Sequence, residues 1–293
     1  MPHTHERASH SPRAQAAATE SVGFGSLDPG VCRELSQIVY EHSGIFLGDN
    51  RQSLVFARIN KRMRQLGLTD PRDYLHVIRA DKSSTELGQL LDAISTNVTQ
   101  FFREERHFTV LQDLMKQWVA QGRQRISIWC AASSSGEEPY TIAMVARETL
   151  PPDMPVTILA SDISTRVLQA ARQGIYREQD LRRVPAPYVR RYFQRGVSSR
   201  TQHLVRVKPA LRDLVSYSQI NLSTPPFHVP RDLDAVFCRN VMIYFTPTLR
   251  QKLARNLLSH LRRDGILFLG MAETLPAEFH PLRTREPSVY RKQ

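Results

Sequence analysis

The chain has 293 residues, which is enough for one large domain or two smaller ones. Hydrophobic residues make up 41% and charged residues 23%, a balance that excludes a wholly disordered chain and is typical of a folded globular protein. The formal net charge of +12 indicates an anionic partner, and on charge alone nucleic acid, an anionic membrane surface and an acidic protein all fit.

The first stretch, residues 1–25, is polar and lacks the apolar core of a secretory signal, so we expect a disordered leader. No run approaches the about 20 apolar residues that cross a bilayer. The three cysteines, Cys32, Cys130 and Cys238, are scattered without the spacing of metal ligands, which is typical of reduced thiols. We therefore expect a soluble cytoplasmic protein without membrane insertion and without a metal site.

Residues 26–95 show helical periodicity and no β-alternation, which predicts a small all-α domain. Gly44, Gly67 and the Asp70-Pro71 pair supply the expected stops and starts. The expected helices cover residues 31–44, 50–67, 70–80 and 84–96.

The second of these helices is strongly basic. Its cations, which include Arg51, Arg58, Lys61 and Arg62, are followed by no acid until Asp70. Three of them share one helical stripe, next to an apolar stripe formed by Val55, Ile59, Met63 and Leu66. A basic face of this kind is commonly only a solvated surface, and docking to an acidic partner is the alternative.

From residue 96 to residue 293, short apolar runs alternate with amphipathic stretches, which predicts a doubly wound parallel α/β sheet. A stretch at about residues 190–215 breaks this rhythm and resembles a small antiparallel β insertion. The expected strands are 125–131, 156–162, 214–220, 233–239 and 265–271, and the expected helices between them include 138–150, 164–173 and 246–261.

The first two strand ends carry candidate ligand groups, because ligands of such sheets bind beyond the carboxyl ends of the strands. The turn Ala131–Tyr140 combines small residues with a helix start, but it lacks the glycine motif of a dinucleotide site and the lysine of a P-loop. On its own it fits an ordinary strand–helix connection equally well. Asp162 ends the second strand, where such folds place an acid for ribose hydroxyls. The alternative there is a helix N-cap supplied by Asp162 or Ser164.

Two later strand ends add to this set. Asn221 and Leu222 could offer an amide and an apolar lid to adenine, although alone they favour a simple turn. Arg239 and Asn240 end the fourth strand, and buried charged or amide groups need partners, which favours a ligand-facing role. Together, the four strand ends indicate one nucleoside-bearing ligand.

Five motifs carry a family resemblance: TNVTQFFRE (96–104), CAASSSGEEPY (130–140), ASDI (160–163), INL (220–222) and FCRNVMIYF (237–245). In this order they resemble the CheR family of chemotaxis receptor methyltransferases, from about residue 27 to near the C-terminus. The resemblance implies an all-α domain followed by a Rossmann-like α/β methyltransferase domain with a small antiparallel β-subdomain. It also implies S-adenosyl-L-methionine as cofactor, S-adenosyl-L-homocysteine as product, and protein-glutamate O-methyltransferase activity on methyl-accepting chemotaxis receptors.

The same resemblance implies the site residues. It points to Arg103 and Tyr244 as catalytic groups, and the variant turn SSSGEEPY casts no doubt on the site. The implied cofactor contacts are Asn97, Thr99, Arg103, Glu138, Asp162, Asn221, Leu222, Arg239 and Asn240. The basic helix, with Arg51, Arg58, Lys61 and Arg62, would dock the glutamate-bearing cytoplasmic helices of the receptor.

The chemistry of this activity makes modest demands on the protein. A glutamate side chain has a pKa of ~4.3, so at neutral pH it is already an anionic nucleophile and needs no general base. Arg103 would clamp a carboxylate of substrate or cofactor through its planar fork, and Tyr244 would orient the reacting groups. Glu138 suits the cofactor's ammonium and Asp162 its ribose. For Arg103 the alternative is a surface salt bridge with Glu104.

Two other functions compete with this one. The net charge of +12 fits a nucleic-acid methyltransferase on the same fold, but the chain has neither an N-P-P-[YF] motif nor a Pro-Cys nucleophile. A non-catalytic cofactor sensor is disfavoured by the intact Arg103 and Tyr244. We therefore expect no nucleic-acid partner and a monomer. Whether the loop Gly196–His203 makes a tether site for a receptor peptide stays open.

Overall fold

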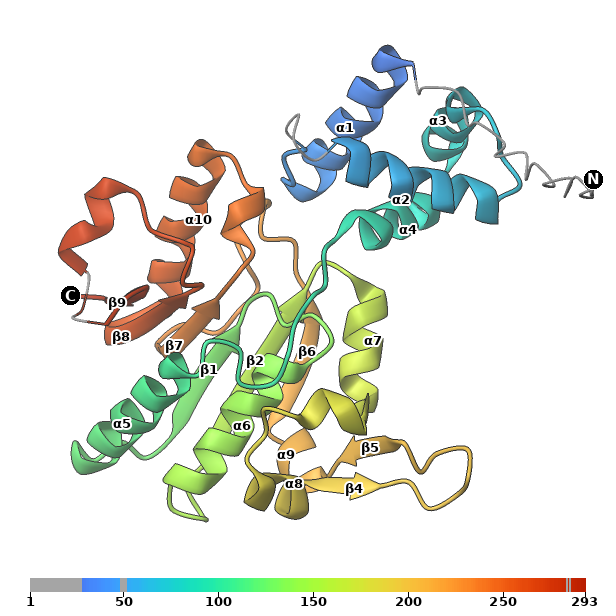
Figure 1. Cartoon of the computed structure of the whole chain (residues 1–293). Helices are drawn as coiled ribbons and strands as arrows, with labels where there is room; N and C mark the ends of the chain where they lie inside the picture. The colour runs from blue at the N-terminus through green and yellow to red at the C-terminus, as the bar shows by residue number, and fades with distance from the viewer. Residues whose placement is uncertain (1–27, 48–51, 283, 285) are drawn as a thin grey trace, which may run out of the picture.

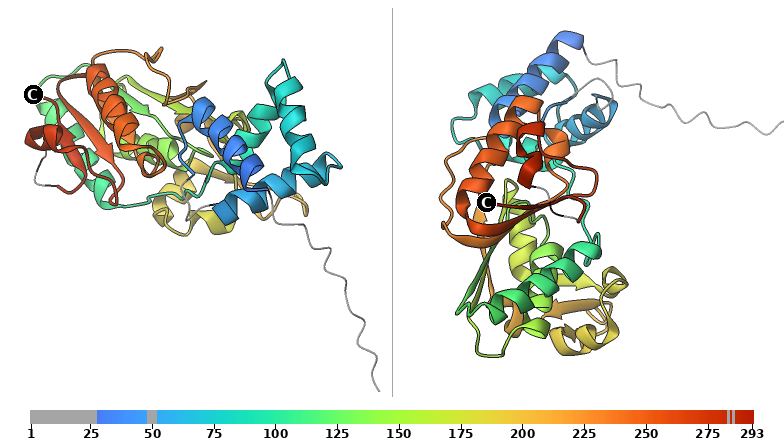
Figure 2. Two further views of the ribbon diagram at one scale, coloured as in Figure 1. Left: turned by 90° about the horizontal axis from the view of Figure 1, so that it is seen from above. Right: turned by 90° about the vertical axis from the view of Figure 1, so that its left-hand side faces the viewer.

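The computed structural model describes residues 28–47, 52–282, 284 and 286–293. The predicted leader and Arg51 lie outside these described residues. Within them the chain forms a bundle of four helices and a larger α/β domain, joined by the extended linker that follows the fourth helix (Figures 1 and 2). An all-α part followed by an α/β part is the predicted fold class.

The helical bundle is built by capped amphipathic helices. Asp28 and Asp70 cap the first and third, each accepting a hydrogen bond of 2.8 Å from a backbone N–H two residues on. Gly44 ends the first helix in the left-handed conformation. Leu35, Ile59 and other apolar side chains make the common core. The helices are α1 (Pro29–Ser43), α2 (Gln52–Gln65), α3 (Pro71–Ala80) and α4 (Thr85–Ile94).

Arg62, one of the cations that we predicted to dock a partner, forms an ion pair inside the bundle. The guanidinium of Arg62 donates two hydrogen bonds, of 2.8 and 2.6 Å, to the carboxylate of Glu86 on α4. Tyr74 donates a third, of 2.8 Å, to the same carboxylate. Arg62 thus pairs inside the bundle with an acid 24 residues away in sequence, and its role in docking stays a prediction.

The α/β domain has a six-stranded sheet in the order β6-β2-β1-β7-β8-β9. All neighbouring pairs are parallel except β8 and β9, which are antiparallel. The chain leaves β1 toward β2 and β6 and later returns to β7 on the other side of β1, so the switch point lies between β1 and β7. The strands are β1 (Ile126–Cys130), β2 (Val156–Asp162), β6 (Val215–Gln219), β7 (Leu233–Cys238), β8 (Leu261–Leu269) and β9 (Val289–Arg291).

Side-chain alternation along the buried strands divides the core into two layers. Ile126 and Ile128 of β1 pack with helices α5 (Arg106–Ala120) and α6 (Glu137–Thr149), whereas Trp129 packs with α10 (Pro247–His260). Helix α7 (Thr165–Gln173) lies beside β2 and β6 (Figure 1). The sheet is thus covered on both faces, which confirms the predicted Rossmann-like fold.

The segment of the chain between α7 and β6 forms a separate three-stranded antiparallel sheet, in the order β3-β5-β4. Its strands are β3 (Ile175–Arg177), β4 (Phe193–Arg195) and β5 (Leu204–Val207). The predicted insertion at about 190–215 therefore needs correction at both ends. It begins earlier, with β3, and its last strand is β5, because residues 215–219 form β6 of the large sheet. Helices α8 (Ala186–Tyr192) and α9 (Pro209–Arg212) accompany the small sheet.

The helical bundle contacts the α/β domain through the end of α1. The N–H of Phe46 donates a hydrogen bond of 2.8 Å to the carbonyl of Tyr244, in the short 3-10 helix η3 (Met242–Tyr244). The Asn221 amide donates one of 2.7 Å to the carbonyl of His42. Among the described residues, no helix has the length and apolar character needed to cross a membrane.

Gly44 lies at this contact and supports a testable prediction. It has φ +71°, and a Cβ added there would meet Leu249 Cδ2 at 2.5 Å and Ser223 Cβ at 2.7 Å. Gly67 has the same φ but nothing within 4 Å of an added Cβ. We expect Gly67→Ala to lower the unfolding free energy by about 1–2 kcal/mol through backbone strain alone. Gly44→Ala should cost clearly more, and equal losses in denaturant melts would contradict a close domain contact.

Candidate active site

A cavity opens at the carboxyl ends of the parallel strands, beyond the switch point between β1 and β7. Its space, including the open mouth, is about 920 Å³. The helical bundle and linker contribute Ser43, Ile45 and residues 94–96, which we did not predict. All the predicted cofactor and catalytic residues line this one cavity: Asn97, Thr99, Arg103, Glu138, Asp162, Asn221, Leu222, Arg239, Asn240 and Tyr244.

The turn from β1 into α6 supplies one wall of the cavity. Ala131, Ala132 and Ser134 line it, so small side chains leave room for a ligand beside the strand end. Gly136, in the same turn, is not among the residues that line the cavity. Its φ is +100°, and an added Cβ would lie 2.8 Å from the Tyr176 hydroxyl and 2.9 Å from Ala171 Cβ. Gly136 is therefore required for packing against α7 and the small sheet.

Asp162 ties two loops together at the cavity wall. Its carboxylate accepts a hydrogen bond of 2.9 Å from the N–H of Ser134 and one of 3.0 Å from the N–H of Ser164. Burial raises the pKa of Asp162, although these N–H groups oppose the shift. The N-cap of α7 is Ser164, whose hydroxyl accepts from the N–H of Val167 at 3.2 Å. Each oxygen of Asp162 keeps a lone pair, so an acceptor remains for a ligand hydroxyl.

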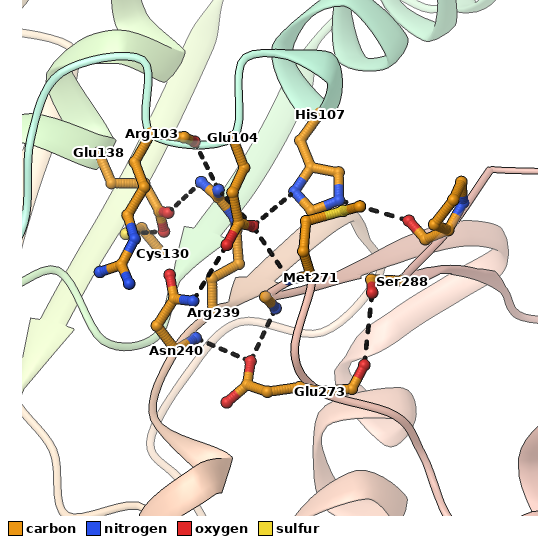
Figure 3. Close-up of polar contacts among 12 residues, drawn as sticks. Arg103, Glu104, His107, Cys130, Glu138, Arg239, Asn240, Met271, Glu273 and Ser288 are labelled. Atoms are coloured by element: carbon orange, nitrogen blue, oxygen red, sulfur yellow. Dashed lines mark hydrogen bonds and ion pairs between the residues drawn. The ribbon is translucent and has the colours of Figure 1, made fainter.

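Arg239 lies at the centre of a buried polar network (Figure 3). Its side chain has no exposed surface. It donates to the carboxylates of Glu138 at 2.6 Å and Glu104 at 2.9 Å, and to the carbonyl of Arg103 at 2.5 Å. The Cys130 thiol donates to the other oxygen of Glu138 at 3.1 Å. Arg239 therefore fixes the acid that we predicted to bind the cofactor's ammonium.

Charge in this network determines which groups are ionised. Burial opposes ionisation of Glu104, but the hydrogen bond and charge of Arg239 lower the pKa of its carboxyl below the usual value. Burial lowers the pKa of His107, and the Arg239 charge lowers it further, so the imidazole is neutral at pH 7. Burial raises the pKa of the Cys130 thiol well above its usual value. Cys130 is thus a hydrogen-bond donor and not a nucleophile.

Sequence reasoning missed two acids of this network. Glu104 has a positive φ of +56°, and Glu273 follows β8 and is 4% exposed. Glu104 was considered only as a partner for Arg103, and the structure places it on Arg239 instead. A signal was present for Glu273, because it is an acid just after the apolar run GILFLGM.

Arg103, from the segment between α4 and α5, and Tyr244, from η3, both line the cavity. Arg103 donates a hydrogen bond of 2.9 Å to the carbonyl of Val98. Among the described residues it has no ion pair, whereas the nearby Arg106 and Arg239 both pair with glutamates. A guanidinium at the cavity therefore remains able to bind a carboxylate.

The remaining predicted residues differ in how far their side chains are engaged. The Asn97 side-chain amide nitrogen is buried without a hydrogen-bond partner, and such a group in a cavity indicates a ligand. The amide of Asn221 is already bonded to His42, so its predicted contact with adenine could come only from its remaining polar atoms. Arg58 donates to Thr96 at 3.2 Å and to the carbonyl of Ile94, which braces the linker, while Lys61 is exposed.

The residues present fit a nucleoside with an amino-acid tail. The unsatisfied Asn97 amide, the acids Glu138 and Asp162, and the small-residue wall at Ala131 supply donors, acceptors and space in one cavity. No group of three potential metal ligands occurs among the described residues.

Comparison with known proteins agrees with this arrangement. Residues 32–95 match the all-alpha domain of CheR methyltransferases, and residues 97–290 match their SAM-binding domain. The chain is 39% identical to the chemotaxis protein methyltransferase of Escherichia coli (strain K12) over 260 residues, which cover 88% of this chain and 89% of the relative. It is 38% identical to chemotaxis protein methyltransferase 2 of Pseudomonas aeruginosa, with 93% and 98% covered. The chain therefore belongs to the CheR family, and it is an S-adenosylmethionine-dependent methyltransferase of chemotaxis.

Proposed function

We propose that the protein esterifies glutamate side chains on the cytoplasmic helices of methyl-accepting chemotaxis receptors. The observation that carries this proposal is the guanidinium of Arg103, which has no ion pair among the described residues and lines the same cavity as the predicted cofactor contacts. A carboxylate is the group that such a fork binds best. A glutamate acceptor is therefore favoured over a nucleic-acid base, for which the cavity offers no comparable feature.

The proposed roles follow from the positions of the side chains. S-adenosylmethionine supplies a methyl group on a sulfonium centre, which an anionic oxygen can attack directly. Glu138, fixed by Arg239, would hold the cofactor's ammonium, and Asp162 would accept from its ribose hydroxyls. Arg103 would orient a carboxylate, and Tyr244 would contact the reacting groups. The cavity needs to supply alignment and exclusion of water, and alignment alone can contribute ~7–11 kcal/mol.

The basic helix α2 would contribute to docking less than we expected from the sequence. Arg62 is held inside the bundle and Arg58 braces the linker, which leaves Lys61 as the exposed cation of the predicted set that is described. An exposed cation on α2 would attract acidic receptor helices over a distance of about 10 Å at moderate salt.

The experiment that tests this function uses methyl-labelled cofactor with a receptor cytoplasmic fragment and, separately, with DNA and RNA. Label on the receptor that is released by mild base as methanol is expected, because carboxylate methyl esters hydrolyse in base. Replacing the receptor's glutamates at the labelled positions with glutamine should remove the label. Label found only on nucleic acid, or base-stable label on the receptor, would contradict the proposal.

A further inference from the structure

The carboxylate of Glu273 joins the ends of strands β7 and β8 (Figure 3). One of its oxygens accepts two hydrogen bonds of 2.7 Å, from the N–H groups of Asn240 and Gly270. The other accepts one of 3.3 Å from the N–H of Ile243. Glu273 is 4% exposed, and no cation pairs with it within the described ranges of the chain. Burial raises the pKa of the Glu273 carboxyl, and the hydrogen bonds from these backbone N–H groups oppose that shift.

These contacts depend on a carboxylate, which offers acceptor lone pairs on both oxygens. A glutamine side chain would present an NH2 group to one of the two sets of N–H donors, and two donors cannot bond to each other. Asn240 moreover has φ +59°, a left-handed conformation that asparagine tolerates better than most side chains but that contacts with its surroundings help to hold. The bond from the Asn240 N–H to Glu273 is such a restraint.

A second acid holds the other end of the same residue. The Asn240 side-chain amide donates a hydrogen bond of 3.2 Å to Glu104. Gly270 lies beneath it, where an added Cβ would approach the Asn240 amide nitrogen to 2.4 Å and Glu273 to 2.8 Å. Asn240 is thus held by a hydrogen bond at its backbone, by another at its side chain, and by close packing against Gly270. It lines the cavity together with Tyr244, which follows four residues later.

We propose that Glu273 is a positioning residue, which holds Asn240 and the η3 turn in the geometry that binds the cofactor. Its effect on the cofactor rests on family membership. Its effect on methyl transfer, through Tyr244, rests on the proposed function. The two are tested separately, by cofactor affinity and by turnover.

The first experiment is a double-mutant cycle on the binding of S-adenosylhomocysteine, measured by calorimetry without any methyl acceptor. Glu273→Gln should weaken the affinity by about tenfold or more, since hydrogen bonds to buried charged groups contribute on this scale. If Glu273 acts through Asn240, the same substitution in an Asn240→Ala background should add less than threefold. Full additivity of the two losses would overturn the proposal.

Two further variants separate positioning from folding. Glu278→Gln changes an exposed glutamate in an ion pair with Arg255 and should bind the product like the wild type. Gly270→Ala keeps every charge but crowds Asn240, so it should reproduce the affinity loss of Glu273→Gln while the protein still melts cooperatively. Wild-type affinity in a folded Gly270→Ala protein, or affinity losses that only follow the unfolded fraction, would also overturn the proposal. A wild-type protein that binds the product but methylates no receptor would count against the proposed function alone.

Discussion

Arg239→Met should lower the unfolding free energy by about 3–5 kcal/mol and abolish measurable binding of S-adenosylhomocysteine. The guanidinium of Arg239 is fully buried between the carboxylates of Glu138 and Glu104. Methionine would fill part of its volume but would leave two acids within one low-dielectric site without their cation. Removing one partner of a buried ion pair has a cost of this size, because the remaining charge is not compensated. Denaturant melts and calorimetric titration measure the two effects.

A matched surface variant shows whether burial causes the loss. Arg255→Met removes an arginine from the exposed pair with Glu278, and we expect little change in stability or product binding. Adding Glu104→Gln to Arg239→Met should recover part of the stability, since it removes one of the two uncompensated charges. A small loss for Arg239→Met, similar to that of Arg255→Met, would contradict the importance of the buried network.

The helices and strands that the sequence predicted correctly are those with a long apolar run or a clear hydrophobic periodicity. Strand β7, Leu233–Cys238, is buried at every position, and such strands of parallel sheets appear in sequence as continuous apolar runs. Strand β9 was not predicted, because its three residues are too few for a periodic signal. Strand β3 was missed for the same reason, which placed the small sheet too late in the chain.

The candidate site shows a similar division. The motifs predicted ten residues that line one cavity. Seven lie at or just after the ends of parallel strands, which meet at one edge of the sheet, whereas Asn97, Thr99 and Arg103 belong to the linker between α4 and α5. The partners of those residues could not be predicted. Glu273 lies 33 residues from Asn240, Glu104 lies 135 residues from Arg239, and Glu86 lies 24 residues from Arg62. Pairing over such separations depends on tertiary structure, so a cation that looks free in sequence can be internal.

Arg103→Ala should reduce turnover on receptor glutamates by about 100-fold or more while the protein stays folded. Misplacement of a reacting group by about 1 Å can cost this factor, and Arg103 is the group that would align the carboxylate. Arg103→Lys keeps the charge but loses the planar fork, so we expect it to recover only part of the rate. Initial rates with labelled cofactor, measured over a range of both cofactor and receptor concentrations, give kcat and both KM values.

The contrast between Arg103 and its neighbour makes this result interpretable. Arg106 lies three residues on and pairs with Glu286 at the surface, outside the cavity. Arg106→Ala removes the same charge from the same segment and should leave turnover within about twofold of the wild type, as exposed pairs contribute little. If Arg103→Ala raises chiefly the KM for the cofactor, the guanidinium holds the cofactor's carboxylate. If it lowers kcat at saturating cofactor and receptor, Arg103 acts on the methyl transfer itself, and equal rates for Arg103→Ala and Arg106→Ala would exclude both roles.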